Sequence, residues 1–283
     1  MMASQCATLA TNRKISYSIH GNSPNAPWII LSNSFGIDIS LSEPVAQRFA
    51  TSGFRVLSYD HPGHGQSSPV ADVNKVNFEE MTDDIDDLLQ LLDIENIHAW
   101  IGLSLGAASG VYMACRRPKL IKHLIYCGCP PASLSALGIM SLDQINAMRD
   151  EAENDGTTAN AIRHMHYGWA SKEWLEANLD QDARLVLASS TLSLDGWRAM
   201  MTLQKNVKFD MRPLVPDLVA SCGRIMFVKG SNDLRINPLV DMMSEIVMKE
   251  VGEFKAVTVP DSGHVMFLQN EDYFCNSILD FIS

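Results

Sequence analysis

The sequence predicts an α/β fold in which helices cover both faces of a mostly parallel, twisted sheet. Short apolar runs alternate with helical patterns along the chain, which is typical of a parallel sheet with crossover helices. The runs are continuous rather than alternating, as expected for strands with both faces buried. The length of 283 residues suits one large domain or a core with an insertion. The expected core strands are 28–31, 54–59, 99–101, 124–127, 225–228 and 256–259.

Helical periods lie between these runs. One helix is expected to begin after Asn77, because Asn77 can cap it and Glu80 stands three residues later. The last helix is expected to start near Asn270. The apolar stripe of the first of these helices consists of Met81, Ile85, Leu88, Leu89 and Leu92.

The rhythm of strand and helix stops between about Pro130 and Asp217, where only helical patterns occur. This stretch predicts a helical cap at 130–217, inserted into an α/β core formed by 1–129 and 218–283. The cap holds Trp169, Trp174 and Trp197, three of the five tryptophans. A substrate contact in the cap is expected from Trp169 and His166.

Composition limits the partners. The chain has 22 Lys and Arg against 33 Asp and Glu, and the resulting net charge of −11 makes nucleic acid an unfavourable partner. Neither an apolar run long enough to span a bilayer nor a signal-peptide pattern is found in the sequence. Of the six cysteines only Cys127 and Cys129 are close, and C-x-C alone is not a zinc spacing. We therefore expect free thiols, no metal site and a cytoplasmic location.

The segment GLSLG at 102–106 carries the decisive motif, G-x-S-x-G, between a predicted strand and a predicted helix. A nucleophile on such a sharp turn occupies strained backbone, and its hydroxyl projects above the sheet. Gly102 and Gly106 leave the space that the turn needs. Ser104 is therefore the predicted nucleophile.

A serine needs a base at neutral pH, and the base needs a group that orients it. His264 follows the last expected strand, at the carboxyl edge of the sheet where the serine turn also opens. Asp233 follows the preceding strand in GSNDLRINP. The order serine, acid, histidine is that of α/β-hydrolases. Asp261, three residues before His264, is the rival acid, and Asp60 lies in the segment DHPGHG, which is interpreted as a structural turn.

Two backbone N–H groups are expected to bind the oxyanion of the transition state. One belongs to Leu105, directly after the nucleophile. The other belongs to Phe35, in the loop SNSFGID that follows the first core strand. Asn33 and Ser34 in the same loop are expected to contact the substrate.

These motifs identify the chain as a member of the α/β-hydrolase superfamily, and it most resembles the 3-oxoadipate enol-lactone hydrolases. That family typically shows SNSLGTD, YD-x-RGHG-x-S, GLSMGG and SGH, and the counterparts here are SNSFGID, YDHPGHGQS, GLSLGA and SGH at 262–264. The resemblance implies Ser104, Asp233 and His264 as the triad. Pro62 stands where the lactonases usually carry arginine, and Ala107 replaces their second glycine.

The sequence therefore predicts a serine hydrolase that cleaves a small lactone or carboxylic ester through an acyl-enzyme, with 3-oxoadipate enol-lactone as one candidate substrate. A non-hydrolytic or C–C bond-cleaving enzyme of the same fold is the alternative, for example in secondary-metabolite biosynthesis, and a small-molecule receptor is a third. A carboxylated substrate would need a cation from the cap, for which Arg163, Arg184, Arg198 and Arg212 are available. Neither G-x-x-x-x-G-K nor H-E-x-x-H occurs in the sequence, so no cofactor is expected.

Overall fold

The computed structural model describes residues 4–251 and 254–283. Within them, eight strands form one sheet in the order β1-β2-β4-β3-β5-β6-β7-β8. The pairs β1/β2 and β2/β4 are antiparallel, and every other pair of neighbouring strands, including β4/β3, is parallel. The strands are β1 Gln5–Thr8, β2 Lys14–His20, β3 Trp28–Ser32, β4 Arg55–Tyr59, β5 Ile97–Leu103, β6 Ile121–Cys127, β7 Arg224–Gly230 and β8 Lys255–Val259. The predicted α/β architecture with a mostly parallel sheet is confirmed.

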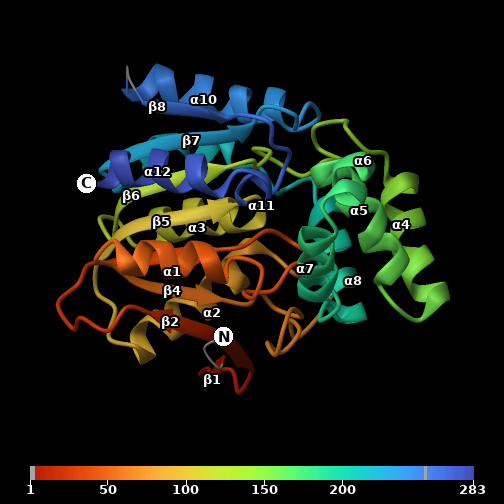
Figure 1. Cartoon of the computed structure of the whole chain (residues 1–283). Helices are drawn as coiled ribbons and strands as arrows, with labels where there is room; N and C mark the ends of the chain where they lie inside the picture. Colours follow the sequence, from red (N-terminus) through yellow and green to blue (C-terminus); the bar gives the residue numbers. More distant parts are fainter. Residues whose placement is uncertain (1–3, 252–253) are drawn as a thin grey trace.

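Helices cover both faces of this sheet (Figure 1). Helices α1 (Glu43–Thr51) and α12 (Glu271–Ile282) contact each other on one face, with the short α11 (Met266–Gln269) beside α12. The other face carries a continuous row formed by α2 (Phe78–Leu91), α3 (Leu105–Arg116), α9 (Val215–Ser221) and α10 (Asn237–Val251), and the 3-10 turn η1 (Arg212–Leu214) leads into α9.

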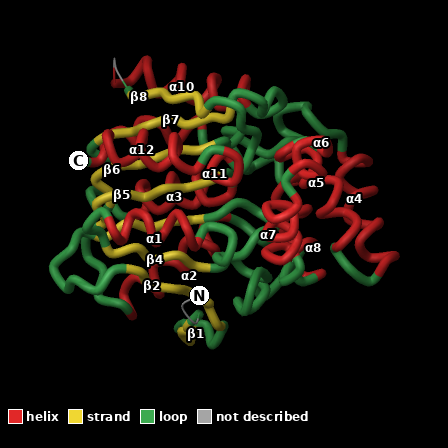
Figure 2. The backbone as a smooth tube through the Cα atoms, viewed as in Figure 1, coloured by secondary structure: helices red, strands yellow, loops and turns green. Residues whose placement is uncertain are grey.

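Five further helices lie between β6 and β7 in the chain and gather beyond the carboxyl ends of the strands (Figures 1 and 2). They occupy the stretch for which the sequence predicts a cap, and the boundaries 130 and 217 stay a prediction. The helices are α4 Leu142–Asp155, α5 Ala159–Ala170, α6 Lys172–Ala177, α7 Leu179–Ser189 and α8 Leu194–Lys205.

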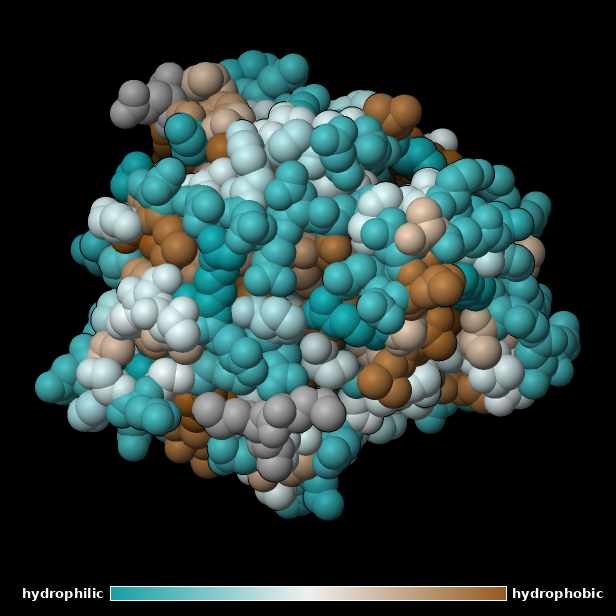
Figure 3. Space-filling model, in the orientation of Figure 1, coloured by the Kyte–Doolittle hydropathy of each residue, from teal (hydrophilic) through white to brown (hydrophobic). Residues whose placement is uncertain are grey.

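Local sequence explains where the helices begin. Asn77 accepts a hydrogen bond from the Glu80 N–H at the start of α2, as predicted, and Asn270 caps α12 in the same way. Ser141 and Gln144 form a full capping box at α4. In the described part of the chain, no helix is both long and apolar enough to cross a membrane. Figure 3 shows a largely hydrophilic face, with hydrophobic residues gathered over the cap helices.

Two glycines let helix α3 approach the sheet closely. A Cβ at Gly106 would lie 2.0 Å from the Ser32 carbonyl oxygen of β3, and one at Gly102 would lie 2.4 Å from the Gly106 oxygen. Real Cβ atoms do not come this near to backbone, so both positions require glycine. The indole of Trp100 donates to the same Gly106 oxygen over 2.9 Å, which fixes the turn from below.

Replacing Gly106 with alanine is therefore expected to destabilise the fold. The added methyl must push α3 away from β3, and overpacking of this kind costs about 1–3 kcal/mol or more. Gly168→Ala is the matched control, because a Cβ at this glycine in α5 would meet nothing within 4 Å. The control should raise the free energy of unfolding by about 0.5–1 kcal/mol. Urea unfolding of both variants measures the difference, and equal stabilities would contradict the steric argument.

Candidate active site

The serine turn lies at the carboxyl end of the central strand β5. Ser104 has φ 51° and ψ −110°, a conformation that few non-glycine residues adopt, and it directly precedes α3. Its own N–H donates to the Cys127 carbonyl over 2.8 Å, while its carbonyl accepts from Ala107 and Ala108. These bonds hold the strained backbone in place. The serine side chain consequently borders a cavity between the sheet and the cap.

Asp233 and His264 form a buried pair at the same edge. Asp233 follows β7, His264 follows β8, and His264 Nδ1 lies 2.7 Å from Asp233 Oδ2. Their side chains are only 4% and 7% exposed, so little solvent screens the pair. Asp261, the rival acid, is exposed in the turn three residues before His264, at φ 53°. Asp233 and His264 both line the cavity that Ser104 borders. In the described part of the chain, the His264 ring bonds Asp233 and makes no hydrogen bond to Ser104 Oγ.

A cap residue holds the histidine loop. The His264 N–H donates to the Trp169 carbonyl oxygen at the end of α5 over 2.8 Å. The two rings lie 6.1 Å apart at an angle of 25°, close to stacked. A Cβ at Gly263 would lie 2.0 Å from the same carbonyl oxygen, so the loop passes the cap at the closest distance a backbone permits.

The loop 33–36 brings a second backbone segment to the serine. Phe35 and Leu105 both line the cavity beside Ser104. Gly36 N–H donates to His64 Nε2 over 2.8 Å and is therefore occupied. Among the described residues the N–H groups of Phe35 and Leu105 donate to no protein acceptor, and that of Leu105 lies in the first helical turn, where no intrahelical acceptor exists. Both groups are thus available to an anion in the cavity.

The turn DHPGHG at 60–65 anchors the loop that follows β3. The sequence did not predict these contacts. Asp60 Oδ1 accepts from the Ile39 N–H over 2.8 Å, and His61 Nε2 lies 2.9 Å from the Asn33 carbonyl oxygen, to which it donates. His64 accepts from Gly36 at Nε2 and donates from Nδ1 to the Pro62 oxygen over 3.0 Å. The pairing of a short turn with a loop some 25 positions earlier has no signature in local sequence.

Burial sets the charge of these groups. It lowers the pKa of His61 to about 3 and the pKa of His64 to about 4, and it raises the pKa of the Asp60 carboxyl to about 6. Both imidazoles are therefore neutral at pH 7. Neutrality matters for His64 in particular, because only the unprotonated Nε2 can accept the Gly36 N–H.

The four residues expected to contact substrate separate into two pairs. Ser34 and Trp169 line the cavity, whereas Asn33 and His166 do not. Asn33 turns its amide nitrogen to the Asp38 carbonyl over 3.2 Å. His166 is buried, with Nε2 2.9 Å from Ser189 Oγ of α7, and burial lowers its pKa to about 4. Its helical position faces the packing between α5 and α7 rather than the cavity.

The expected cap cation is also absent from the cavity wall. Arg163 pairs with Asp182, Arg198 with Glu153 and Asp195, and Arg212 with Asp210, while Arg184 bonds Gln181 and the Leu41 oxygen. None of these four arginines lines the cavity, because each has a nearer partner on the cap or core surface. The prediction that one of them faces the pocket applies to a carboxylated substrate, and for such a substrate this structure does not meet it. Arg235, two residues after Asp233, lines the cavity instead.

The comparisons with known proteins agree with this architecture. Residues 27–271 match the model of the alpha/beta hydrolase fold family. The chain belongs to this α/β-hydrolase family. A 3-oxoadipate enol-lactonase 1 of Acinetobacter baylyi is 31% identical over 172 residues, which span 59% of each chain. A putative carbamate hydrolase RutD of Rhizobium rhizogenes is 34% identical over 111 residues, 38% of this α/β-hydrolase and 41% of that protein.

Solved structures share the fold over nearly the whole chain. The enol-lactonase of Burkholderia xenovorans superimposes with a TM-score of 0.83 at 23% identity, covering 98% of this α/β-hydrolase and 99% of that chain. An esterase of Exiguobacterium antarcticum gives 0.80 at 17% identity, with 99% of both chains covered. The resemblance to this superfamily, and within it to enol-lactonases, is confirmed.

The neutral histidines predict how stability depends on pH. The folded state keeps His64 unprotonated down to about pH 4, whereas the unfolded chain binds a proton below about pH 6.5. The stabilisation is therefore complete above pH 6.5 and is lost as the pH falls toward 4. When the pH is lowered from 7.5 to 5, the free energy of unfolding should fall in both proteins, but in His64→Gln the fall should be smaller than in the wild type by about 2 kcal/mol.

Urea unfolding at the two pH values measures this difference. His164→Gln is the control, because the His164 side chain is 70% exposed and its removal should leave the pH dependence unchanged. Equal pH dependence in His64→Gln and the wild type would contradict a neutral, buried His64.

Proposed function

We propose that this α/β-hydrolase cleaves a carboxylic ester or lactone through an acyl-enzyme on Ser104. One observation carries the proposal: the buried Asp233–His264 pair lines the same cavity as a serine held in strained backbone at a helix N-terminus. Nucleophile, base and orienting acid are the parts that acyl transfer requires. The substrate is a small molecule that enters the cavity between the sheet and the cap.

The geometry supports one role for each group in the proposed first half-reaction. Asp233 engages His264 Nδ1, so Nε2 is the nitrogen that takes the proton of Ser104 as its oxygen attacks the carbonyl carbon. The carbonyl oxygen becomes an oxyanion and is bound by the N–H groups of Phe35 and Leu105. His264 then returns the proton to the departing alkoxide, and the acyl group stays on Ser104.

Water completes the cycle by the same route. His264 Nε2 takes a proton from water, the hydroxide oxygen adds to the acyl carbon, and the second tetrahedral oxyanion uses the same two N–H groups. Its collapse releases the carboxylic acid and returns the proton to Ser104. Throughout, the Asp233 carboxylate stabilises the imidazolium, an effect that is strong because both side chains are buried.

The name of the Acinetobacter relative makes 3-oxoadipate enol-lactone the first specific substrate to test. This lactone carries a carboxylate, and the cavity offers one arginine, Arg235, among the residues that line it. Simple neutral esters, such as 4-nitrophenyl acetate, test the general chemistry independently of that substrate.

Ser104→Ala should lower kcat/KM for any active ester by about 10⁴-fold or more, because the acyl-enzyme can no longer form. A fluorophosphonate should add covalently to the wild-type chain at Ser104, as seen by peptide mass spectrometry, and should not label the variant. Ser190→Ala is the control, since this serine of the cap is exposed and its hydroxyl donates to the Leu187 oxygen of α7. Full turnover in Ser104→Ala would refute the mechanism.

Asp233→Asn should lower kcat by about 10⁴-fold, because an amide cannot stabilise the imidazolium and favours the wrong tautomer of His264. Asp261→Asn is the matched control, since this neighbouring carboxyl is exposed. We expect it to retain wild-type kcat within a few fold in the same assay. A larger loss of kcat in Asp261→Asn than in Asp233→Asn would show that Asp261, and not Asp233, is the acid that orients His264.

A further inference from the structure

Methionine side chains form much of the cavity wall above Ser104. They come from separate parts of the cap: the loop before α4, α4 itself, α5 and α8. The residues are Met140, Met148, Met165, Met200 and Met201. Those of α8 are almost fully buried and the other three are partly buried. Methionine has three rotatable bonds and a polarisable sulfur, so such a wall adapts to flexible apolar ligands.

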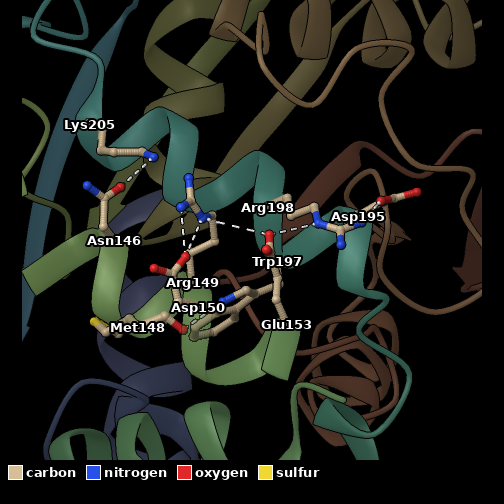
Figure 4. Close-up of polar contacts among 9 residues, drawn as sticks. All are labelled: Asn146, Met148, Arg149, Asp150, Glu153, Asp195, Trp197, Arg198 and Lys205. Carbon is tan, nitrogen blue, oxygen red and sulfur yellow. Dashed lines mark hydrogen bonds and ion pairs between the residues drawn. The ribbon is translucent and has the colours of Figure 1, made fainter. Parts of the chain in front are cut away.

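The backbone behind this wall is fixed by polar contacts between α4 and α8 (Figure 4). The Trp197 indole donates to the Met148 carbonyl oxygen over 3.2 Å, and Lys205 Nζ donates to Asn146 Oδ1 over 3.0 Å. Arg198 bonds Glu153 over 3.0 Å at the other end of the helix pair. These contacts join α4 and α8 without involving the methionine side chains, whose flexible thioether chains remain able to change rotamer.

Further apolar side chains complete the enclosure. Phe78 of α2 and Phe209 pack with ring centroids 4.5 Å apart, and both line the cavity. Ile145 and Leu203, also in the wall, are 1% and 2% exposed. The cavity measures about 350 Å³, near the lower end of the range for small-molecule sites, which is roughly 300–1,000 Å³.

Three charged or imidazole side chains of the cavity wall, Arg235, His164 and Glu151, are also accessible to solvent. Arg235 and His164 are exposed, and Glu151 is partly exposed with its carboxylate 3.6 Å from His164 Nδ1. Besides these three residues, Asp233 and His264 are the only charged or imidazole side chains of the described chain that line the cavity. A carboxylate held within the methionine wall would have no cation beside it, and burial of an unpaired charge is strongly unfavourable.

We propose that the cavity binds a neutral ester or lactone that carries an unbranched apolar chain of medium length, about six to ten carbons. The reacting carbonyl lies at Ser104, and the chain extends between α5 and α8 against the methionines. This inference rests on the proposed function, because it takes Ser104 as the nucleophile. It assigns the substrate class by the chemistry of the wall: length and hydrophobicity are selected, and a terminal carboxylate is rejected.

Chain-length profiles test the assignment. We would measure kcat/KM for 4-nitrophenyl esters from acetate to dodecanoate, and for acetate esters of alcohols from ethanol to dodecanol. Each methylene that enters the wall should raise kcat/KM about threefold to fourfold, up to about six to ten carbons, in at least one series. A profile that is flat or highest at the shortest member in both series would overturn the proposal.

A variant that fills the cavity should shorten the preferred chain. In Met148→Trp the added volume should lower the ratio of kcat/KM for the octanoate ester to kcat/KM for the acetate ester at least about tenfold. Met148→Leu conserves the volume and should change this ratio much less than Met148→Trp does. Met242→Trp, on the surface of α10 and outside the cavity lining, controls for the bulk of tryptophan. An unchanged profile in Met148→Trp would count against the methionine wall.

A matched pair of substrates tests the charge. The 4-nitrophenyl ester of hexanoic acid and the 4-nitrophenyl monoester of adipic acid have six-carbon acyl chains and differ in their terminal groups. The hexanoate should react at least about tenfold faster in kcat/KM. If the carboxylated ester is preferred and Arg235→Ala removes that preference, Arg235 binds a carboxylate and the proposal is wrong.

Failure of this proposal is distinguishable from failure of the proposed function. Fluorophosphonate labelling of Ser104, together with loss of acetate ester hydrolysis in Ser104→Ala, supports the mechanism whatever the profile is. With both of these results in hand, a flat profile refutes the substrate class alone.

Discussion

The close approach of α3 to β3 is the constraint on which the carboxyl edge of the sheet depends. Gly106 passes the Ser32 oxygen at a distance that leaves no room for a Cβ, and Ser104 takes a left-handed φ so that the chain can turn that sharply. The approach places the first turn of α3, with its free N–H groups, beside the loop that leaves β3. The proposed nucleophile and the backbone N–H groups proposed to bind the oxyanion thus depend on one packing contact.

The loop beyond β3 would be free to move if the turn after β4 did not hold it. Two neutral histidines and one carboxyl of that turn bond the backbone of residues 33, 36 and 39. Neutral imidazole suits the task because one ring nitrogen donates and the other accepts. In His64 both are used, so the side chain bridges its own turn and the loop. The geometry of the Phe35 N–H is therefore set by residues that do not themselves line the cavity.

The sequence was sufficient for those features that depend on local pattern. Continuous apolar runs located all six predicted core strands, and the glycines around Ser104 indicated the sharp turn before α3. Asp233 and His264 could be placed at one edge because parallel strands end together. Side-chain directions in the cap could not be predicted, since they depend on how five helices pack. His166 bonds Ser189, and three of the four cap arginines pair with acidic side chains; helical periodicity reveals neither arrangement.

The hydrogen bond from the His264 N–H to the Trp169 carbonyl joins the histidine loop to the end of α5. Any outward movement of that end of α5 must either break this bond or carry the histidine loop with it. The stacked indole and imidazole oppose the same movement. Opening of the cavity on this side is therefore coupled to the position of the His264 imidazole. A molecule that pushes α5 outward would displace the proposed base His264, whereas one that fits beneath α5 would leave His264 in its position.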